Sequence, residues 1–194
     1  MYPDSLPPGV VIWLTGLSGA GKSTIARALN HELGKAGIGC FVLDGDDIRS
    51  GLNSDLGFSA DDRMENVRRI AHVARLLSSR GKVVVVAAIT PSEATRALAK
   101  DIVGQMFREV FVDTPIAVCE ARVPKGLYRK VRSGALKAFT GVSDIYERST
   151  SPDLVLCTHA SSIAEETQKL LALIGVEINS DTSTSASTLS PTSD

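Results

Sequence analysis

The chain has 194 residues, of which 43% are hydrophobic and 22% charged, a globular composition with enough length for one domain and a full core. Its formal net charge of -1 argues against a nucleic-acid-binding protein, because such proteins carry a large basic excess, but it leaves small anionic ligands possible. The three cysteines, Cys40, Cys119 and Cys157, are widely spaced in apolar segments, so we expect reduced thiols and neither a disulfide framework nor a zinc cluster.

Strand-like apolar runs alternate with amphipathic stretches along the chain, a pattern typical of parallel βαβ architecture. The expected strands cover residues 10–15, 40–43, 83–89, 109–112 and 154–157, and the expected helices cover residues 22–36, 61–80, 92–104, 115–122 and 161–174. They predict an α/β fold with a doubly wound, five-stranded parallel sheet and helices on both faces. Because ligands of such sheets bind beyond the carboxyl ends of the strands, we expect Gly16, Asp44, Thr90 and Asp113 to border one crevice.

Residues 16–23 read G-L-S-G-A-G-K-S directly after the first expected strand. This is a complete phosphate-binding loop, in which glycines let successive backbone N–H groups point at phosphate oxygens while the following helix adds its positive end. Lys22 can then reach the β- and γ-phosphates, and the Ser23 hydroxyl can ligate Mg²⁺. The loop therefore predicts a protein that binds a nucleoside triphosphate.

Acidic residues follow the second expected strand, in the run L-D-G-D-D-I-R over residues 43–49. A carboxylate at this edge can hold a water of the magnesium shell or accept the proton of an attacking hydroxyl. The third expected strand has no Asp or Glu, so Asp44 and Asp46 are the best candidates for the acid on the metal side. The alternative for Asp44, Asp46 and Asp47 is that the carboxylate only caps a short helix.

The next segment carries polar residues at helical spacing. Ser59 is a plausible N-cap, after which Arg63 and Asn66 fall three apart on one helix face and could grip one ligand. An arginine fork suits phosphate or sulfate, and Asn offers both a donor and an acceptor to a base or sugar. The alternative is a solvated charged helix. Phe58 and Phe139 lie in glycine-flanked loops, where two rings could sandwich a purine.

Six basic residues and no acidic one occur between Arg122 and Lys137. In a chain of net charge -1, this local excess suggests a mobile cationic lid over phosphates, which closes to exclude water during transfer. A solvated basic helix face is the alternative.

Taken together, these motifs closely resemble the adenylylsulfate kinase (APS kinase) family. The resemblance rests on G-L-S-G-A-G-K-S-T, L-D-G-D-D-I-R-S-G-L, D-L-G-F-S-A-D-D-R-M-E-N-V-R-R, P-K-G-L-Y-R-K and F-T-G-V, in the family's order over roughly residues 10–155. It implies transfer of the γ-phosphoryl group of ATP to the 3′-hydroxyl of adenosine 5′-phosphosulfate (APS), giving the sulfate donor PAPS and ADP. It also implies a P-loop kinase fold, Mg²⁺ and a homodimer.

The resemblance also implies roles for single positions. For ATP, it implies contacts with Gly16, Leu17, Ser18, Gly19, Ala20, Gly21, Lys22, Ser23, Thr24 and Arg122. For the acceptor nucleotide, it implies Asp46, Arg49, Phe58, Arg63, Asn66, Ile89, Lys125, Leu127 and Phe139, with the adenine between the two phenylalanines. Catalytic roles fall on Lys22, Asp44, Asp46 and Thr90, and Mg²⁺ on Ser23 and Asp44, the latter directly or through water.

The chain departs from the family pattern at a few positions. Thr90 stands where family members commonly have a serine, Ser92 replaces a tyrosine, and Val123 replaces an acid in the motif R-V-P-K-G-L-Y. Arg148, after Tyr146 and Glu147, is a further difference. Two other interpretations therefore stay open on the sequence alone: a related kinase with a different nucleotide-linked acceptor, and a nonenzymatic nucleotide-binding subunit that regulates a sulfate-activating partner.

The expected domain covers residues 9–178, with a lid at about 122–148. Residues 1–8 are proline-rich and expected to be irregular, and the Ser/Thr-rich residues 179–194 are expected to be disordered. The N-terminus lacks the basic residues and apolar core of a signal peptide, and the apolar run 83–89 is too short to cross a bilayer. We therefore expect a cytoplasmic protein without membrane or nucleic-acid partners.

Overall fold

The fold is built on one parallel sheet. The computed structural model describes residues 9–123 and 146–177. Its strands are β1 (Val10–Thr15), β2 (Cys40–Asp44), β3 (Val83–Ala87), β4 (Phe107–Val112) and β5 (Leu154–Leu156). They pair in the order β2-β3-β1-β4-β5, and every pair is parallel. Since β1 lies at the centre, the loop that follows it sits in the middle of the carboxyl edge of the sheet.

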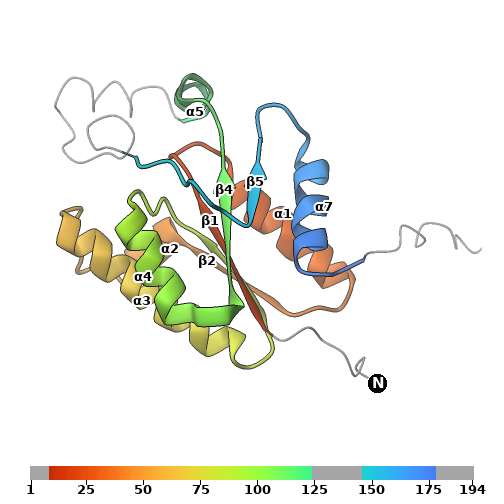
Figure 1. Cartoon of the computed structure of the whole chain (residues 1–194), viewed down its shortest axis with the longest axis horizontal. Helices are drawn as coiled ribbons and strands as arrows, with labels where there is room; N and C mark the ends of the chain where they lie inside the picture. The colour runs from red at the N-terminus through yellow and green to blue at the C-terminus, as the bar shows by residue number, and fades with distance from the viewer. Residues whose placement is uncertain (1–8, 124–145, 178–194) are drawn as a thin grey trace, which may run out of the picture.

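Helices cover both faces of this sheet. They are α1 (Lys22–Lys35), α2 (Gly45–Ser50), α3 (Ala60–Ser78), α4 (Glu93–Val103), α5 (Ile116–Arg122) and α7 (Ile163–Leu173), with a short 3-10 helix, η1 (Gly104–Met106), before β4. Figure 1 shows α1 and α7 on one side of the sheet and α3 and α4 on the other. The predicted doubly wound α/β fold with helices on both faces is confirmed.

The alternation of side chains along β1 divides the core in two. All six residues of this strand are buried, because successive side chains point to opposite faces and helices cover both. Ile12 and Leu14 pack into the cluster with Leu29 of α1 and Leu170 of α7. Val11 and Trp13 join the other cluster, in which they pack with side chains of α3 and α4. A central strand that is covered on both faces therefore has apolar residues at nearly every position, as β1 does.

The element boundaries differ from expectation in a few places. The helix α2 is not among the expected helices and entered only as the short helix of the capping alternative, since six residues are too few to show a helical period. The fourth strand begins at Phe107, two residues earlier than expected, and the third ends at Ala87 instead of residue 89. Ser59 caps α3 as predicted, in a capping box with Asp62. The early end of β3 leaves residues 88–91 as an irregular segment at the carboxyl edge.

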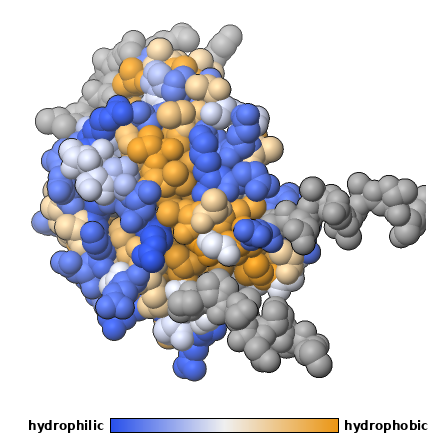
Figure 2. Space-filling view, turned by 45° about the vertical axis from the view of Figure 1, so that its right-hand side comes forward, coloured by the Kyte–Doolittle hydropathy of each residue, from blue (hydrophilic) through white to orange (hydrophobic). Residues whose placement is uncertain are grey.

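The surface carries some apolar side chains. Figure 2 shows hydrophobic surface at the centre of the face turned forward, bordered by hydrophilic surface. Among the large hydrophobic residues exposed in the described ranges are Val155, on the edge strand β5, and Ile163, at the start of α7. None of the described helices has the length and apolar character needed to span a membrane.

Some sequence-based expectations concern positions for which the structure gives no description. These are the irregular N-terminal segment, the greater part of the lid with Lys125, Leu127 and Phe139, and the Ser/Thr-rich tail.

Candidate active site

One cavity of about 910 Å³ is lined by side chains and backbone from the carboxyl edge of the sheet. The predicted site residues that line it are Ser18, Gly19, Gly21, Lys22, Ser23, Thr24, Asp44, Asp46, Arg49, Phe58, Arg63, Asn66, Ile89, Thr90 and Arg122. Residues as far apart in the sequence as Ser18 and Arg122 thus meet at one place, as expected for this class of sheet. Three members of the phosphate-binding loop, Gly16, Leu17 and Ala20, are not among the lining residues.

The conformation of the phosphate-binding loop requires glycine at Gly19. Its φ is 80°, in the left-handed region that side chains disfavour. A Cβ atom placed there would lie 2.7 Å from the carbonyl oxygen of Cys119 and 2.8 Å from Cγ2 of Val123. The end of α5 therefore packs directly against the loop, and Val123, one of the departures from the family pattern, forms part of this contact.

Lys22 is enclosed by the loop that it follows. Its Nζ donates to the carbonyl oxygens of Gly16 at 2.9 Å and Leu17 at 2.8 Å, and the residue is only 8% exposed. Burial lowers the pKa of Lys22 to about 8, an effect that neighbouring charges, among them the Asp46 and Asp44 carboxylates, only partly oppose. An anionic ligand beside this amine would stabilise its charged form, which suits Lys22 for contact with phosphate.

A polar network joins the end of α5 to the phosphate-binding loop. Arg122 donates through Nη1 to Oγ1 of Thr158 at 2.9 Å and through Nη2 to the Thr158 carbonyl at 2.8 Å. The Thr158 hydroxyl donates to the carbonyl oxygen of Ala20 at 2.7 Å, and the Thr114 hydroxyl donates to the same oxygen at 3.1 Å. Thr158 and Ile163 also line the cavity, and neither was predicted from the sequence.

Asp44 caps α2 and thereby holds its carboxylate in place. Its Oδ1 accepts from the backbone N–H of Asp46 at 3.0 Å. The capping role that the sequence left open for Asp44, Asp46 and Asp47 therefore belongs to Asp44, the last residue of β2, and the assignment of the cap to Asp46 or Asp47 is wrong. Asp46 is exposed at the first turn of α2, and both carboxylates line the cavity.

The donor atoms fit Mg²⁺ but not a metal held by protein alone. Ser23 and Asp44 offer hard oxygen ligands on the cavity wall. Within residues 9–123 and 146–177, no group of three or more His, Cys, Asp or Glu residues could hold a metal ion. Mg²⁺ commonly takes only one or two protein ligands and completes its shell with phosphates and water. The residues present match that pattern.

Two arginines converge at Phe58. Arg49 donates through Nη1 to the carbonyl oxygen of Gly57 at 2.8 Å, and its guanidinium carbon lies 4.7 Å from the centroid of the Phe58 ring. Arg63 donates through Nε to the Phe58 carbonyl at 2.9 Å. Burial, and secondly the positive charge of Arg63, lower the pKa of Arg49 from its ordinary value. Two cations this close together favour an anion beside them, while Phe58 is 57% exposed.

Asn66 lines the cavity one helical turn beyond Arg63, as the spacing predicted. It is only 6% exposed, and its Oδ1 accepts from Nδ2 of Asn53 at 2.9 Å. Asn53 lies in the turn between α2 and α3, is completely buried and was not predicted as part of the site.

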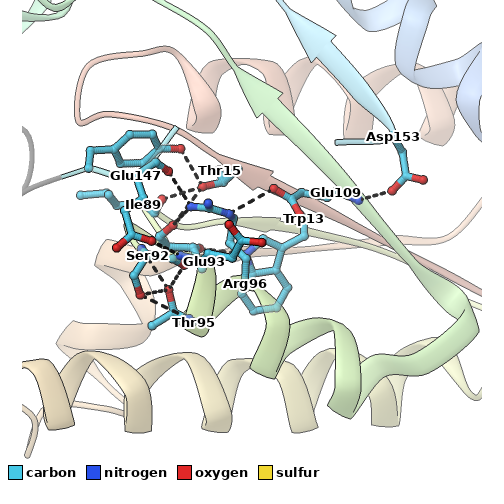
Figure 3. A network of polar contacts seen from close by, with 12 residues as sticks. Trp13, Thr15, Ile89, Ser92, Glu93, Thr95, Arg96, Glu109, Glu147 and Asp153 are labelled. Carbon is cyan, nitrogen blue, oxygen red and sulfur yellow. Dashed lines mark hydrogen bonds and ion pairs between the residues drawn. The ribbon is translucent and has the colours of Figure 1, made fainter. Parts of the chain in front are cut away.

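The Thr90 hydroxyl is engaged inside the protein. Thr90 has a φ of 46° and is 2% exposed, and its Oγ1 accepts from the indole N–H of Trp13 at 2.8 Å. The buried Arg96 donates through Nη1 to the Thr90 carbonyl at 3.2 Å and to the Glu147 carbonyl at 2.9 Å. Figure 3 shows Arg96 within this network, with its Nε 3.3 Å from Oε1 of Glu109. The catalytic role of Thr90 stays a prediction.

Polar contacts hold residues 146–148 against β1, α4 and the end of β4. Oη of Tyr146 lies 3.0 Å from the Thr15 hydroxyl, and a carboxylate oxygen of Glu147 accepts from the first backbone N–H of α4 at 2.7 Å. Arg148 forms an ion pair with Asp113. The expectation that Asp113 borders the crevice is therefore wrong, since its carboxylate is taken by Arg148 and it does not line the cavity.

The fold and the site together define the class of protein. A parallel sheet of order 2-3-1-4-5, a phosphate-binding loop after the central strand, and an acid and an arginine cluster across one cavity are the features of a P-loop phosphotransferase. Lys22 adds the positive charge that phosphoryl transfer needs, and Ser23 and Asp44 offer oxygen ligands for Mg²⁺.

Known proteins identify the family within this class. The profile of the family Adenylylsulphate kinase matches residues 8–157. An adenylyl-sulfate kinase of Paraburkholderia xenovorans (strain LB400) is 52% identical over 164 residues, which cover 84% of this chain and 92% of the relative. That of Enterobacter sp. (strain 638) is 54% identical over 149 residues, or 76% of this chain and 74% of the relative.

A solved structure supports the same family assignment. The Mycobacterium tuberculosis APS kinase CysC in complex with AMPPNP and APS is 48% identical, with a TM-score of 0.83, over 87% of this chain and 99% of that one. The chain belongs to the adenylylsulfate kinase family.

Proposed function

We propose that this enzyme transfers the γ-phosphoryl group of ATP to the 3′-hydroxyl of APS, giving PAPS and ADP, with the roles of its residues assigned as follows. The observation that carries the assignment is one continuous cavity of about 910 Å³, whose lining includes the phosphate-binding loop, the Asp44 edge and both Arg49 and Arg63. Its volume is at the upper end of the range for ligand pockets, in keeping with two nucleotides that meet end to end.

The donor half binds ATP through backbone and lysine. The N–H groups of residues 16–24 and the amino end of α1 surround the phosphates. Lys22 then exchanges the carbonyl oxygens of Gly16 and Leu17 for phosphate oxygens and stabilises the charge of the transferring group. Ser23 and Asp44 would hold Mg²⁺, which when bound neutralises phosphate charge.

The acceptor half recognises an anionic adenine nucleotide. Arg49 and Arg63 supply the positive charge for the phosphosulfate group. Arg49 covers one face of the Phe58 ring, so the other face is available to stack against adenine. The second ring of the predicted sandwich, Phe139, lies outside the described residues, and this part of the assignment rests on the family resemblance.

The proton of the acceptor hydroxyl goes to Asp44. As the 3′-oxygen forms its bond to the γ-phosphorus, the bond from that phosphorus to the bridging oxygen breaks and ADP leaves with its electron pair. The hydrogen bond from the Asp46 N–H fixes the Asp44 carboxylate on the wall of the cavity, which supports its role as proton acceptor.

A coupled assay of ADP release tests the proposal. Purified protein with Mg·ATP should release ADP only when APS is added, and AMP or a cytidylate at the same concentration should not replace it. Chelation of divalent cations with EDTA should abolish turnover. Equal turnover with APS and with the other nucleotides would contradict the assigned acceptor.

The assembly and compartment are further parts of the proposal. A homodimer agrees with the family resemblance, and light scattering of the purified protein measures its mass directly. The cytoplasm, where thiols stay reduced, agrees with the three free cysteines.

A further inference from the structure

Asn53 and Asn66 form a buried amide pair whose orientation can be determined. Nδ2 of Asn53 lies 2.9 Å from Oδ1 of Asn66 and 3.5 Å from the Asn66 backbone carbonyl oxygen. A carbonyl oxygen can only accept, so the atom of Asn53 that faces it must be the amide nitrogen. With Asn53 fixed in this way, Asn66 has to present Oδ1 to it and not its own NH₂ group.

The backbone around Asn53 prevents it from turning away. Its N–H donates to the Ile48 carbonyl at 2.9 Å, and its carbonyl accepts from the Leu56 N–H at 3.1 Å. The residue is 0% exposed, and its Oδ1 has no hydrogen-bond partner within the described part of the chain. A buried amide with one unsatisfied atom lowers stability, so its presence calls for an explanation. Orientation of a neighbouring site residue provides one.

We infer that Asn53 is a positioning residue that locks the side-chain NH₂ of Asn66 toward the acceptor cavity, so that Asn66 can serve the acceptor nucleotide only as a hydrogen-bond donor. The inference rests on the proposed function for the identity of that nucleotide. The ligand atom beside Asn66 must then be an acceptor, such as a phosphosulfate oxygen, a ribose oxygen or a ring nitrogen. An exocyclic amine of the base is excluded from this contact.

Substitution of Asn53 by leucine removes the donor and nearly keeps the shape. In Asn53→Leu the amide of Asn66 is free to rotate, and the KM for APS should rise by roughly tenfold, the scale of one lost hydrogen bond. The KM for ATP and kcat should stay within about twofold, because the donor half is untouched. Ser78→Ala is the matched control, since Ser78 is buried on α3, the helix of Asn66, and within the described residues its hydroxyl donates to the Arg75 carbonyl. It should leave the KM for APS unchanged.

A double variant separates positioning from general damage. If Asn53 acts through Asn66, then Asn53→Leu added to Asn66→Ala should not raise the KM for APS further, as expected for coupled residues. Additive effects in the double variant, or an unchanged KM for APS in Asn53→Leu, would overturn the inference. Should the leucine variant not fold, Asn53→Ala takes its place.

The unmodified protein supplies an independent measurement. In ¹⁵N NMR spectra, saturating APS should shift the side-chain NH₂ signal of Asn66, which is assigned by its absence from Asn66→Ala. No shift at saturation would overturn the inference even if neither Asn53 variant folded. Wild-type protein without APS-dependent turnover would instead overturn the proposed function, so the two failures are distinct.

Discussion

The two halves of the cavity are built by different means. The donor half is mostly backbone, shaped by glycines and enclosed by neighbouring chain, with a single buried lysine. The acceptor half consists of side chains from α2, α3 and the loop between them, and each is held by another group: Arg49 by Gly57, Arg63 by Phe58, and Asn66 by Asn53. Phosphate binding thus depends on local backbone geometry, whereas choice of acceptor depends on a set of supported side chains. Substitutions in the donor half should therefore change kcat or ATP binding, whereas substitutions in the acceptor half should change the KM for APS.

Lys22→Ala should give the largest effect. Loss of this charge should lower kcat by about a thousandfold, on the scale of one lost donor to the transition state, while the protein stays folded. Lys35→Ala on the same helix is the control, because Lys35 is exposed, pairs with Glu32 and does not line the cavity. Steady-state kinetics with APS and ATP measure both, and a kcat near wild type would exclude Lys22 from the transition state.

The Asp44→Asn variant distinguishes the role of Asp44 as proton acceptor from its role as the N-cap of α2. Asparagine is as good an N-cap as aspartate, so the thermal unfolding midpoint should stay near that of the wild type. Turnover should fall about a hundredfold or more, since the amide cannot take the proton of the 3′-hydroxyl, and ATP binding should change little. Asp47→Asn, at the same helix start, serves as control. Full activity of Asp44→Asn would assign the proton to another group or to solvent.

Arg63→Ala should act on the acceptor side alone. Hydrogen bonds to charged groups are strong enough that the KM for APS should rise about 10- to 100-fold, with an unchanged KM for ATP. Arg68→Ala, on the same helix, removes an arginine that pairs with Glu65 and does not line the cavity, and should have no effect on either KM. Equal changes in both KM values for Arg63→Ala would remove the distinction between the two halves.

A change of pH should have the smallest effect, and it should appear in the donor half. Since burial lowers the pKa of Lys22 to about 8 and phosphates favour its charged form, ATP binding above this pH takes up a proton. Raising the pH from 7.5 to 8.5 should therefore weaken ATP binding about threefold. Calorimetry in buffers of different ionisation enthalpy measures the proton uptake, which should be absent in Lys22→Met.

The same shift has a consequence for folding. The unfolded chain holds its Lys22 proton up to about pH 10.5, whereas the folded protein releases it near pH 8. The cost of burying the charged amine is therefore present in full below pH 8 and is lost as the pH rises toward 10.5. Relative to Lys22→Met, the wild type should gain stability across this window.

The donor half was predictable because it is contiguous. One run of residues carries the glycines, the lysine and the serine, and the strand and helix on either side follow from local periodicity. The positions of Arg63 and Asn66 on one face of α3 followed from helical spacing in the same way. The sheet also followed, since alternation of apolar runs with amphipathic helices leaves few topologies.

What the sequence did not reveal depends on contacts between distant residues. Thr158 reaches the Ala20 carbonyl across 138 positions, and no local pattern marks it. Asp113 was expected at the crevice from its place at the end of β4, but an arginine 35 residues later pairs with it. Asn53 lies in a turn, where the sequence shows no helical or strand periodicity, and its proposed role follows from its hydrogen bond to Asn66 in the structure. Polar contacts of this kind arise from tertiary packing rather than local propensity.

The hydrogen bond between the Trp13 indole and the Thr90 hydroxyl gives the protein an intrinsic fluorescent probe of the segment after β3. Trp13 is the chain's one tryptophan, it is fully buried, and its indole N–H ends on a residue of the cavity wall. Any rearrangement of the segment after β3 alters the polarity around this single indole. The wavelength of its fluorescence emission should therefore report a movement of the segment after β3 without an added label. The indole that reports it lies in the buried strand β1, directly before the phosphate-binding loop.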